Sequence, residues 1–82
     1  MNTDVYDTYA TYSNGETVHF DVLLPKGSTH QKAVQIAKQW LKELGGTNEI
    51  AQLSSSRFCH SEAATPEVYS EIKNKGFAIL QL

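Results

Sequence analysis

Hydrophobic and polar residues alternate through the first third of the chain, as they do in β-strands with one buried face. Val18, Phe20 and Val22 occupy every second position between residues 17 and 24, and this period of two predicts a strand. Residues 5–12 are rich in Val, Tyr and Thr, which favour a pleated, half-buried surface. We therefore expect two neighbouring strands at the start of the fold.

The segment between these strands carries a strong turn signal, Asn14-Gly15, because both residues tolerate the positive φ angles of tight hairpins. Two registers are open. A two-residue turn and a three-residue turn with a bulge at Gly15 direct opposite faces of Tyr6-Asp7-Thr8-Tyr9 toward the core. Asp7 and Asp21 can meet across the hairpin in the two-residue registers, whereas staggered, solvated carboxylates are the simpler expectation.

A change to helical spacing follows the second strand. Ser28 is the expected N-cap, and Gln31 stands three residues later, as in a capping box. Gly45 is placed to adopt the left-handed conformation that ends many helices. The apolar stripe of this predicted helix consists of Ala33, Ile36, Ala37, Trp40, Leu41 and Leu44.

The second half of the chain predicts a strand, a helix and a strand. Residues 46–56 indicate a long connection, in which either Ile50 and Leu53 pack under the domain or residues 49–53 form a short extra element. Residues 57–62 indicate a short strand. Thr65 is the expected cap of a helix with Pro66 at its first position, where a missing N–H costs nothing. Residues 77–82 are nearly all apolar, which favours a strand well inside the sheet.

Together these elements predict a single α+β domain over residues 1–82, in the order β-β-α-β-α-β. Helical crossovers normally join parallel strands and are right-handed. We therefore expect an N-terminal hairpin and two helices packed on one face of a four-stranded mixed sheet. The opening hairpin and capped helix also allow a β-grasp-like arrangement as the alternative.

The composition narrows the function classes. The chain has 82 residues, a formal net charge of -2 and seven scattered Lys and Arg residues, so nucleic-acid binding is not expected. No apolar run reaches the length of a membrane span, and the N-terminus lacks the features of a signal peptide. The only cysteine, Cys59, cannot form an internal disulfide. These features favour the cytoplasm.

Candidate chemistry gathers on the face of the sheet that the helices are expected to leave uncovered. If the apolar side chains of the second strand point to the helices, His19 and Asp21 point away from them. If Phe58 lies on the covered side, Arg57 and Cys59 likewise point away. The candidate functional cluster is therefore His19, Asp21, Arg57 and Cys59.

This cluster suggests thiol chemistry at Cys59. A cysteine near a cation or a histidine becomes nucleophilic or redox-sensitive, and Asp21 is placed to orient His19. The structural alternative is a cross-strand pair between Asp21 and Arg57 beside an inert thiol. His60 falls on the covered side of a regular strand, so Cys59 and His60 are not expected to bind one metal together.

A transition metal is the one cofactor that the pattern suggests. His19 and Asp21 would supply two ligands from one face and Cys59 a third, while His60 and Glu62 form another pair. Zinc takes such N, S and O donors, but structural zinc sites normally have paired Cys or His at fixed spacing. The chain has no such pair, so no cofactor is required by the sequence.

Four tyrosines, Tyr6, Tyr9, Tyr12 and Tyr69, suit either an interface or the rim of a core. A two-layer domain leaves one sheet face to be covered, so a second copy of the chain or another protein is an expected partner there. The alternative is that two of the tyrosines close the core. The secondary candidate residues are Asp7, Tyr9, His60 and Glu62.

Four motifs stand in order along the chain: Tyr6-Asp7-Thr8-Tyr9, His19-Phe20-Asp21, Arg57-Phe58-Cys59-His60 and Ala64-Thr65-Pro66-Glu67. With them the chain resembles a family of short bacterial proteins, domain-of-unknown-function family twenty twenty-four. The likeness covers essentially the whole chain, although Ala63 stands where an acidic residue is expected and residues 46–56 are individual. The resemblance implies a small α+β protein and adds no substrate, cofactor or reaction.

We therefore expect a non-catalytic binding or self-association module rather than an enzyme. The alternative is a thiol-based or metal-binding function centred on Cys59 with His19, Asp21 and Arg57. That alternative requires the second and third strands to turn their polar side chains to a common, helix-free surface.

Overall fold

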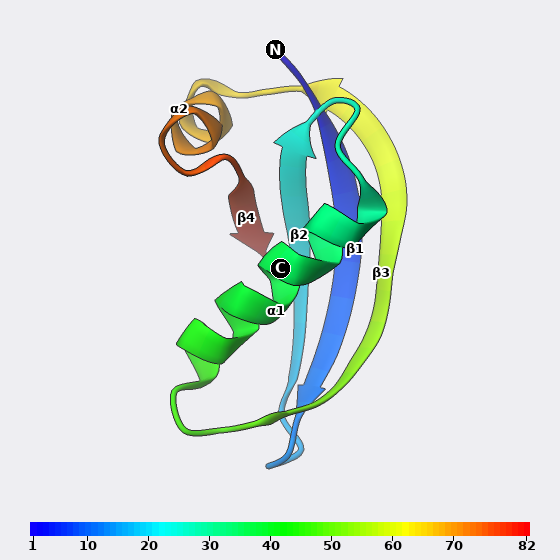
Figure 1. Cartoon of the computed structure of the whole chain (residues 1–82), viewed down its shortest axis with the longest axis vertical. Helices are drawn as coiled ribbons and strands as arrows, with labels where there is room; N and C mark the ends of the chain where they lie inside the picture. Colours follow the sequence, from blue (N-terminus) through cyan, green and yellow to red (C-terminus); the bar gives the residue numbers. More distant parts are fainter.

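The fold consists of one antiparallel sheet, built around a long hairpin, and two helices. The computed structural model describes residues 1–82, apart from the side chain of Ser55. The strands lie in the spatial order β3-β1-β2-β4 (Figure 1), so the α+β class is as predicted. Along the chain the elements are β1 (Asn2–Tyr12), β2 (Thr17–Pro25), α1 (His30–Gly45), β3 (Ile50–Ala63), α2 (Pro66–Lys75) and β4 (Ala78–Gln81).

The hairpin of β1 and β2 uses the three-residue turn with a bulge. The N–H of Tyr12 donates to the carbonyl of Glu16, and Gly15 has a φ of 91°, a conformation that glycine adopts at little cost. In this register Asp7 stands directly opposite Asp21. The expectation of staggered carboxylates is therefore wrong. The carboxylates meet, but in the three-residue register and not in the two-residue registers that were expected to bring them together.

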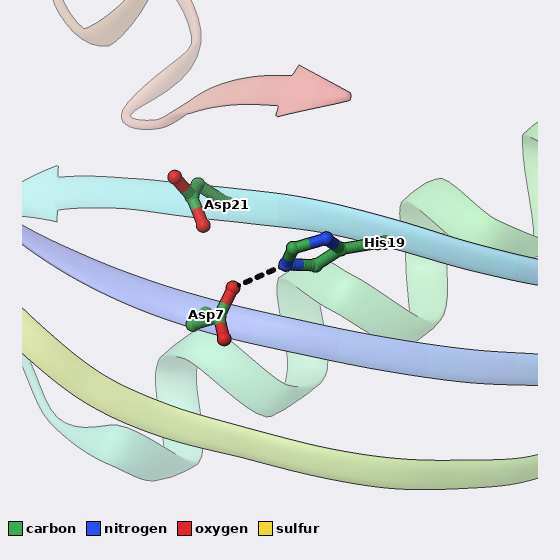
Figure 2. A group of neighbouring side chains, drawn as sticks. All are labelled: Asp7, His19 and Asp21. Carbon is green, nitrogen blue, oxygen red and sulfur yellow. Dashed lines mark hydrogen bonds and ion pairs between the residues drawn. The ribbon is translucent and has the colours of Figure 1, made fainter. Parts of the chain in front are cut away.

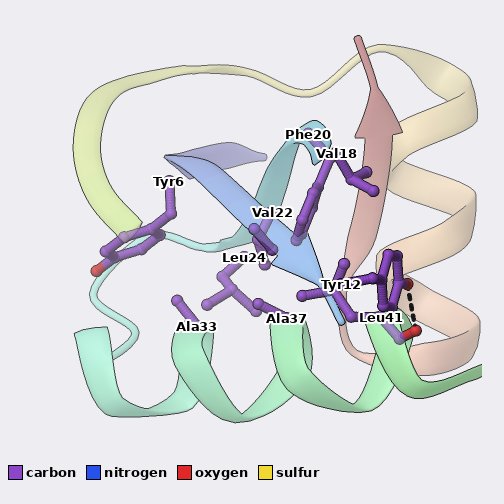
Figure 3. Packing of buried hydrophobic residues seen from close by; sticks show 10 residues of the cluster. Tyr6, Tyr12, Val18, Phe20, Val22, Leu24, Ala33, Ala37 and Leu41 are labelled. Atoms are coloured by element: carbon purple, nitrogen blue, oxygen red, sulfur yellow. Dashed lines mark hydrogen bonds between the residues drawn. The ribbon is translucent and has the colours of Figure 1, made fainter. Parts of the chain in front are cut away.

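Helix α1 covers one face of the sheet through a stripe of small and apolar side chains. Ala33, Ala37 and Leu41 have no exposed surface, and their four-residue spacing aligns them along one side of the helix. They pack against alternate residues of β1 and β2, among them the fully buried Phe20 (Figure 3). Tyr12 closes this core at one end, where its hydroxyl donates to the carbonyl of Leu41.

The ends of α1 each differ by one residue from the prediction. Thr29, not Ser28, is the N-cap, and its hydroxyl accepts from the N–H of Lys32. Gly45 remains helical, and Gly46, with a φ of 60° and a ψ of -111°, takes the positive-φ position after it. Neighbouring residues of similar capping ability make such ends hard to place from sequence. The predicted apolar stripe is confirmed except at its last member, Leu44, which is 48% exposed.

Strand β3 is much longer than the predicted strand over residues 57–62. It begins at Ile50, ends at Ala63 and pairs with β1 as an edge strand. Its register against β1 shifts at three places, because β-bulges insert extra residues. Each shift interrupts the alternation that marks a strand in the sequence. Most of residues 46–56 were therefore wrongly predicted to be a connection.

Helix α2 packs on the face of the sheet opposite α1. Its cap is Thr65, as predicted. Val68 and Ile72 of α2 form a second apolar cluster with Val5 and Leu23 of the hairpin, and these strand residues alternate with those that face α1. The prediction that both helices share one face is therefore wrong. Neither helix of the described chain combines the length and apolar character needed to cross a membrane.

Every ladder in the sheet is antiparallel. Helix α1 carries the chain past β1, so β3 runs in the same direction as β2 without being its neighbour. Helix α2 then leads to the opposite edge, where β4 pairs with β2. The prediction of a mixed sheet is wrong because the crossovers never place two parallel strands side by side. The β-grasp-like alternative does not describe this order either.

Strand β4 is a short edge strand rather than a strand inside the sheet. It pairs with β2 only at residues 20–23, and Leu80 is 46% exposed. Its apolar composition reflects contact with both layers, because Ala78 packs in the α2 cluster and Ile79 against the α1 core. Because its residues are apolar on both faces, this edge strand has the sequence pattern that is expected of a central strand.

Candidate metal centre

Three titratable side chains project together from the hairpin on the side away from α1. Asp7 lies on β1, and His19 and Asp21 lie two residues apart on β2. Figure 2 shows their side chains in front of the strands, with α1 behind the sheet. Helix α2 covers this face only at its other end. We call the uncovered part, formed by the carboxylate–histidine cluster (Asp7, His19 and Asp21) together with Tyr9, the open face.

The carboxylate–histidine cluster is compact enough to share one ion. Nε2 of His19 lies 2.6 Å from Oδ1 of Asp7, and one ligand atom from each of the three residues lies within 4.8 Å of the others. The register of the hairpin explains why the three side chains are close. Asp21 is directly opposite Asp7, and His19 is the diagonal neighbour of Asp7 on the same face. The side chains of His19 and Asp7 are 34% and 35% exposed, so solvent reaches them from one side.

Tyr9 holds the plane of the His19 ring. The two residues are directly opposite in the hairpin, and their rings stack with centroids 4.0 Å apart and planes 9° from parallel. Such a contact restricts rotation of the imidazole about its side-chain bonds. Nε2 of His19 is therefore kept directed at Asp7, which makes Tyr9 a positioning residue for the cluster.

The electrostatics of the cluster favour a positive ligand. Burial raises the pKa of Asp21 above the ordinary aspartate value, and the neighbouring Asp7 carboxylate raises it further. His19 and His60 act in the opposite direction without cancelling these effects. Two carboxylates this close oppose each other's ionisation, and a bound cation would remove that penalty.

Arg57 reaches the same face from β3. It stands directly opposite Asp7, on the side of β1 away from Asp21. Within the described chain no carboxylate lies at ion-pair distance from its guanidinium. The predicted cross-strand pair between Asp21 and Arg57 is wrong, because β1 separates β2 from β3.

Cys59 does not join the carboxylate–histidine cluster. It is the extra residue of a bulge in β3, since Val5 pairs with His60 and Tyr6 pairs with Phe58. The bulge turns His60 to the side of Val5, so the prediction that His60 shares a side with Phe58 is wrong. Nδ1 of His60 also lies 3.1 Å from Sγ of Cys59. The two residues therefore do not face apart as a regular strand would require.

The secondary pair His60 and Glu62 extends this contact along the edge of the sheet. Nε2 of His60 lies 3.6 Å from Oε1 of Glu62, and the two side chains are 52% and 49% exposed. Cys59, also exposed, thus has an imidazole beside it and a carboxylate behind that imidazole. Solvent screening keeps such an exposed arrangement weak.

Asp7 was only a secondary candidate in the sequence, yet it lies at the centre of the cluster. The structure keeps His19 and Asp21 of the predicted set, adds Asp7, and leaves Cys59 aside. The missing information was the hairpin register. Of the two open turns, the three-residue turn at Gly15 aligns Asp7 with Asp21, and a preference for it would have found the cluster.

Two carboxylates and one imidazole on neighbouring strands make a donor set for a divalent ion. Carboxylate oxygens and imidazole nitrogens together suit manganese, iron, cobalt, nickel and zinc. Three protein ligands leave coordination positions open to water or to another molecule, as in catalytic zinc sites. The fold and the cluster thus define a small α+β protein whose open sheet face brings together three side chains of metal-ligating types.

The family follows from comparison with known proteins. A model of the family described as "Domain of unknown function (DUF2024)" matches residues 1–82, and the chain belongs to this family. The resemblance inferred from the four sequence motifs is therefore confirmed. No curated protein matches the chain.

A solved structure supports the fold. The chain is similar to the NMR structure of protein NE1680 from Nitrosomonas europaea, a target of the Northeast Structural Genomics Consortium. The two share 39% sequence identity, with a TM-score of 0.82, and the match covers 100% of this chain and 95% of that one.

Proposed function

We propose that this protein is a small binding module for a divalent transition-metal ion, held by Asp7, His19 and Asp21 on the open face. The observation that carries the proposal is the convergence of three ligand atoms within 4.8 Å of one another. This takes up the metal-binding alternative and moves its centre from Cys59 to the hairpin, whereas the expected binding module was one for a protein partner or a second copy of the chain. An exposed free thiol suits a reducing compartment, so we also propose that the module works in the cytoplasm.

The positions of the ligands support binding without a large rearrangement. All three residues lie on the paired strands of the hairpin, and ligands on strands are held more firmly than ligands on loops. The Tyr9 stack already orients the imidazole. Burial and the nearby Asp7 carboxylate raise the pKa of Asp21. A bound cation would offset both the burial of this charge and the repulsion between the two carboxylates.

Calorimetric titration of tag-free protein with zinc tests this proposal. We expect one ion per chain. His19→Gln and Asp21→Asn each remove or neutralise a ligand, so each should weaken binding on the order of 100-fold, at least as much as losing an outer partner of a ligand. Tyr9→Leu should weaken binding less, because the ring acts on zinc only through His19.

A matched control is His60→Gln, which removes another histidine that lies beside a carboxylate. It should leave zinc affinity within a few-fold of the wild type. Wild-type protein that takes up no zinc would contradict the proposal, and so would equal losses in His60→Gln and His19→Gln.

We infer a second candidate function, thiol chemistry at Cys59, from the 3.1 Å contact between its Sγ and Nδ1 of His60. An imidazole at this distance can accept the thiol proton as the sulfur attacks an electrophile. Alkylation by iodoacetamide at neutral pH should then be slowed at least ~10-fold in His60→Gln, as loss of a weak general base predicts. Equal rates in the variant and the wild type would leave Cys59 an ordinary exposed thiol.

A further inference from the structure

We propose that the metal site also binds a small oxyanion, a carboxylate or a phosphate-like group, which bridges the ion and the guanidinium of Arg57. This inference rests on the proposed metal function and names the class of ligand that completes it. It gives a role to Arg57, the member of the predicted cluster that has a charged side chain but is not a metal ligand.

The position of Arg57 is the first support. Asp7 occupies the middle of the face, with Asp21 directly opposite on β2 and Arg57 directly opposite on β3. Neighbouring strands lie ~5 Å apart, so an ion held between β1 and β2 lies within the reach of an arginine side chain from β3. The guanidinium and the ion would then flank one small molecule.

The absence of a competing partner is the second support. Arg57 is exposed, and in the described part of the chain no carboxylate pairs with it, even though Asp7 is its cross-strand neighbour. Asp7 is instead hydrogen-bonded to His19. A guanidinium in this position keeps its planar set of donors for a ligand, and oxyanions match that set in two-point contacts.

The coordination of the ion is the third support. Three protein ligands do not complete the shell of a divalent transition metal, and an oxygen of a carboxylate or phosphate group is a suitable further donor. The ion would neutralise the repulsion that Asp7 and Asp21 otherwise exert on an anion. Anion binding should therefore depend on the metal, and Arg57 should add affinity to it.

The test uses the whole chain loaded with cobalt(II), whose visible absorption reports changes in its ligands. The loaded protein is titrated with acetate as the carboxylate probe and with sulfate as the tetrahedral probe. We expect a saturable spectral change with at least one of them. Arg57→Gln should raise the half-saturating anion concentration on the order of 10-fold, because a charge-assisted two-point contact is lost.

Two controls isolate the role of the guanidinium. Arg57→Lys keeps the charge without the planar fork, so it should give an intermediate value. Lys38→Gln removes the same charge from α1, on the other side of the sheet, and should match the wild type. Cobalt affinity itself should not fall in Arg57→Gln.

The possible failures are distinguishable. If cobalt does not bind, the proposed metal function is wrong and the oxyanion site is wrong with it. If cobalt binds but neither anion changes the spectrum, the metal function stands and the oxyanion site is wrong. Equal half-saturation in Arg57→Gln and the wild type would also overturn it.

Discussion

The two faces of the central hairpin are built from the same two strands, yet they differ in what they bury. Toward α1, the strands present Phe20, Val22 and Leu24, all without exposed surface. On the other face, the half beyond α2 presents charged and aromatic residues that remain half-buried or exposed. A sheet of this length can thus obtain its stability from one face and keep part of the other for binding.

Two aspartates of the hairpin, Asp4 and Asp21, differ in the direction of their pKa shifts and so in their effect on stability. Asp4 accepts hydrogen bonds from the hydroxyl of Ser61 and the N–H of Gly27, and these bonds lower its pKa. Asp21 has a raised pKa because of burial and the charge of Asp7. The first carboxylate supports the fold, whereas the second opposes it, which is common for residues kept for function.

The largest effect is expected on the α1 face. Leu41 is fully buried in the core, so Leu41→Ala should lower the free energy of unfolding by ~2–5 kcal/mol through lost burial and a residual cavity. Leu44→Ala, at a position 48% exposed on the same helix, should change it by less than ~0.5 kcal/mol. Urea denaturation measures both, and similar losses would show that the covered face has been misassigned.

A smaller effect is expected where α1 meets the end of the hairpin. A Cβ on Gly45 would lie 2.5 Å from Cε1 of Tyr12, and that ring is buried and tied to Leu41. Gly45→Ala should therefore cost ~1–3 kcal/mol of overpacking, although alanine normally stabilises a helix relative to glycine. A stabilised variant would mean that Tyr12 does not pack against this turn.

The two aspartates should respond to neutralisation with opposite signs. Because the pKa of Asp21 is raised, the folded state holds its proton more tightly than the unfolded state, and stability is lost as pH rises through the folded pKa. Asp21→Asn removes that loss. At neutral pH it should raise the free energy of unfolding by less than Leu41→Ala lowers it, and the difference from wild type should vanish below about pH 4.

Asp4→Asn should do the reverse. Because the pKa of Asp4 is lowered, its contribution to stability is fully present above the pKa of the unfolded state and is lost as pH falls through the folded pKa. The variant should be less stable than the wild type at neutral pH, with the difference shrinking in acid. Urea denaturation across pH measures both variants, and changes of the same sign would remove the distinction between them.

The fold was predictable where the pattern was local and regular. Thr65 and the buried stripe of Ala33, Ala37 and Leu41 were found from spacing alone, because caps and helical periodicity are set within a few residues. Strand β3 was largely missed, since its bulges interrupt the alternation. The face on which α2 packs was also missed. It is set by Val5 and Leu23, which make one end of the hairpin apolar on the face opposite α1 as well.

The candidate site was predictable in part for the same reason. His19 and Asp21 were identified because they share a face within one strand, which requires no knowledge of pairing. Asp7 needed the register of the hairpin, and Cys59 was misplaced because a bulge at that residue reverses the side to which His60 points. Contacts between strands depend on tertiary geometry that a single sequence leaves open.

The most direct test of the metal centre is to locate a paramagnetic ion on the folded protein. Manganese(II) added at low ratio to isotope-labelled protein should broaden the amide signals of residues 7–9 and 19–21 first, and Asp21→Asn should abolish that selectivity. Broadening that begins at residues 59–62, or that spreads evenly over the chain, would contradict a site formed by Asp7, His19 and Asp21.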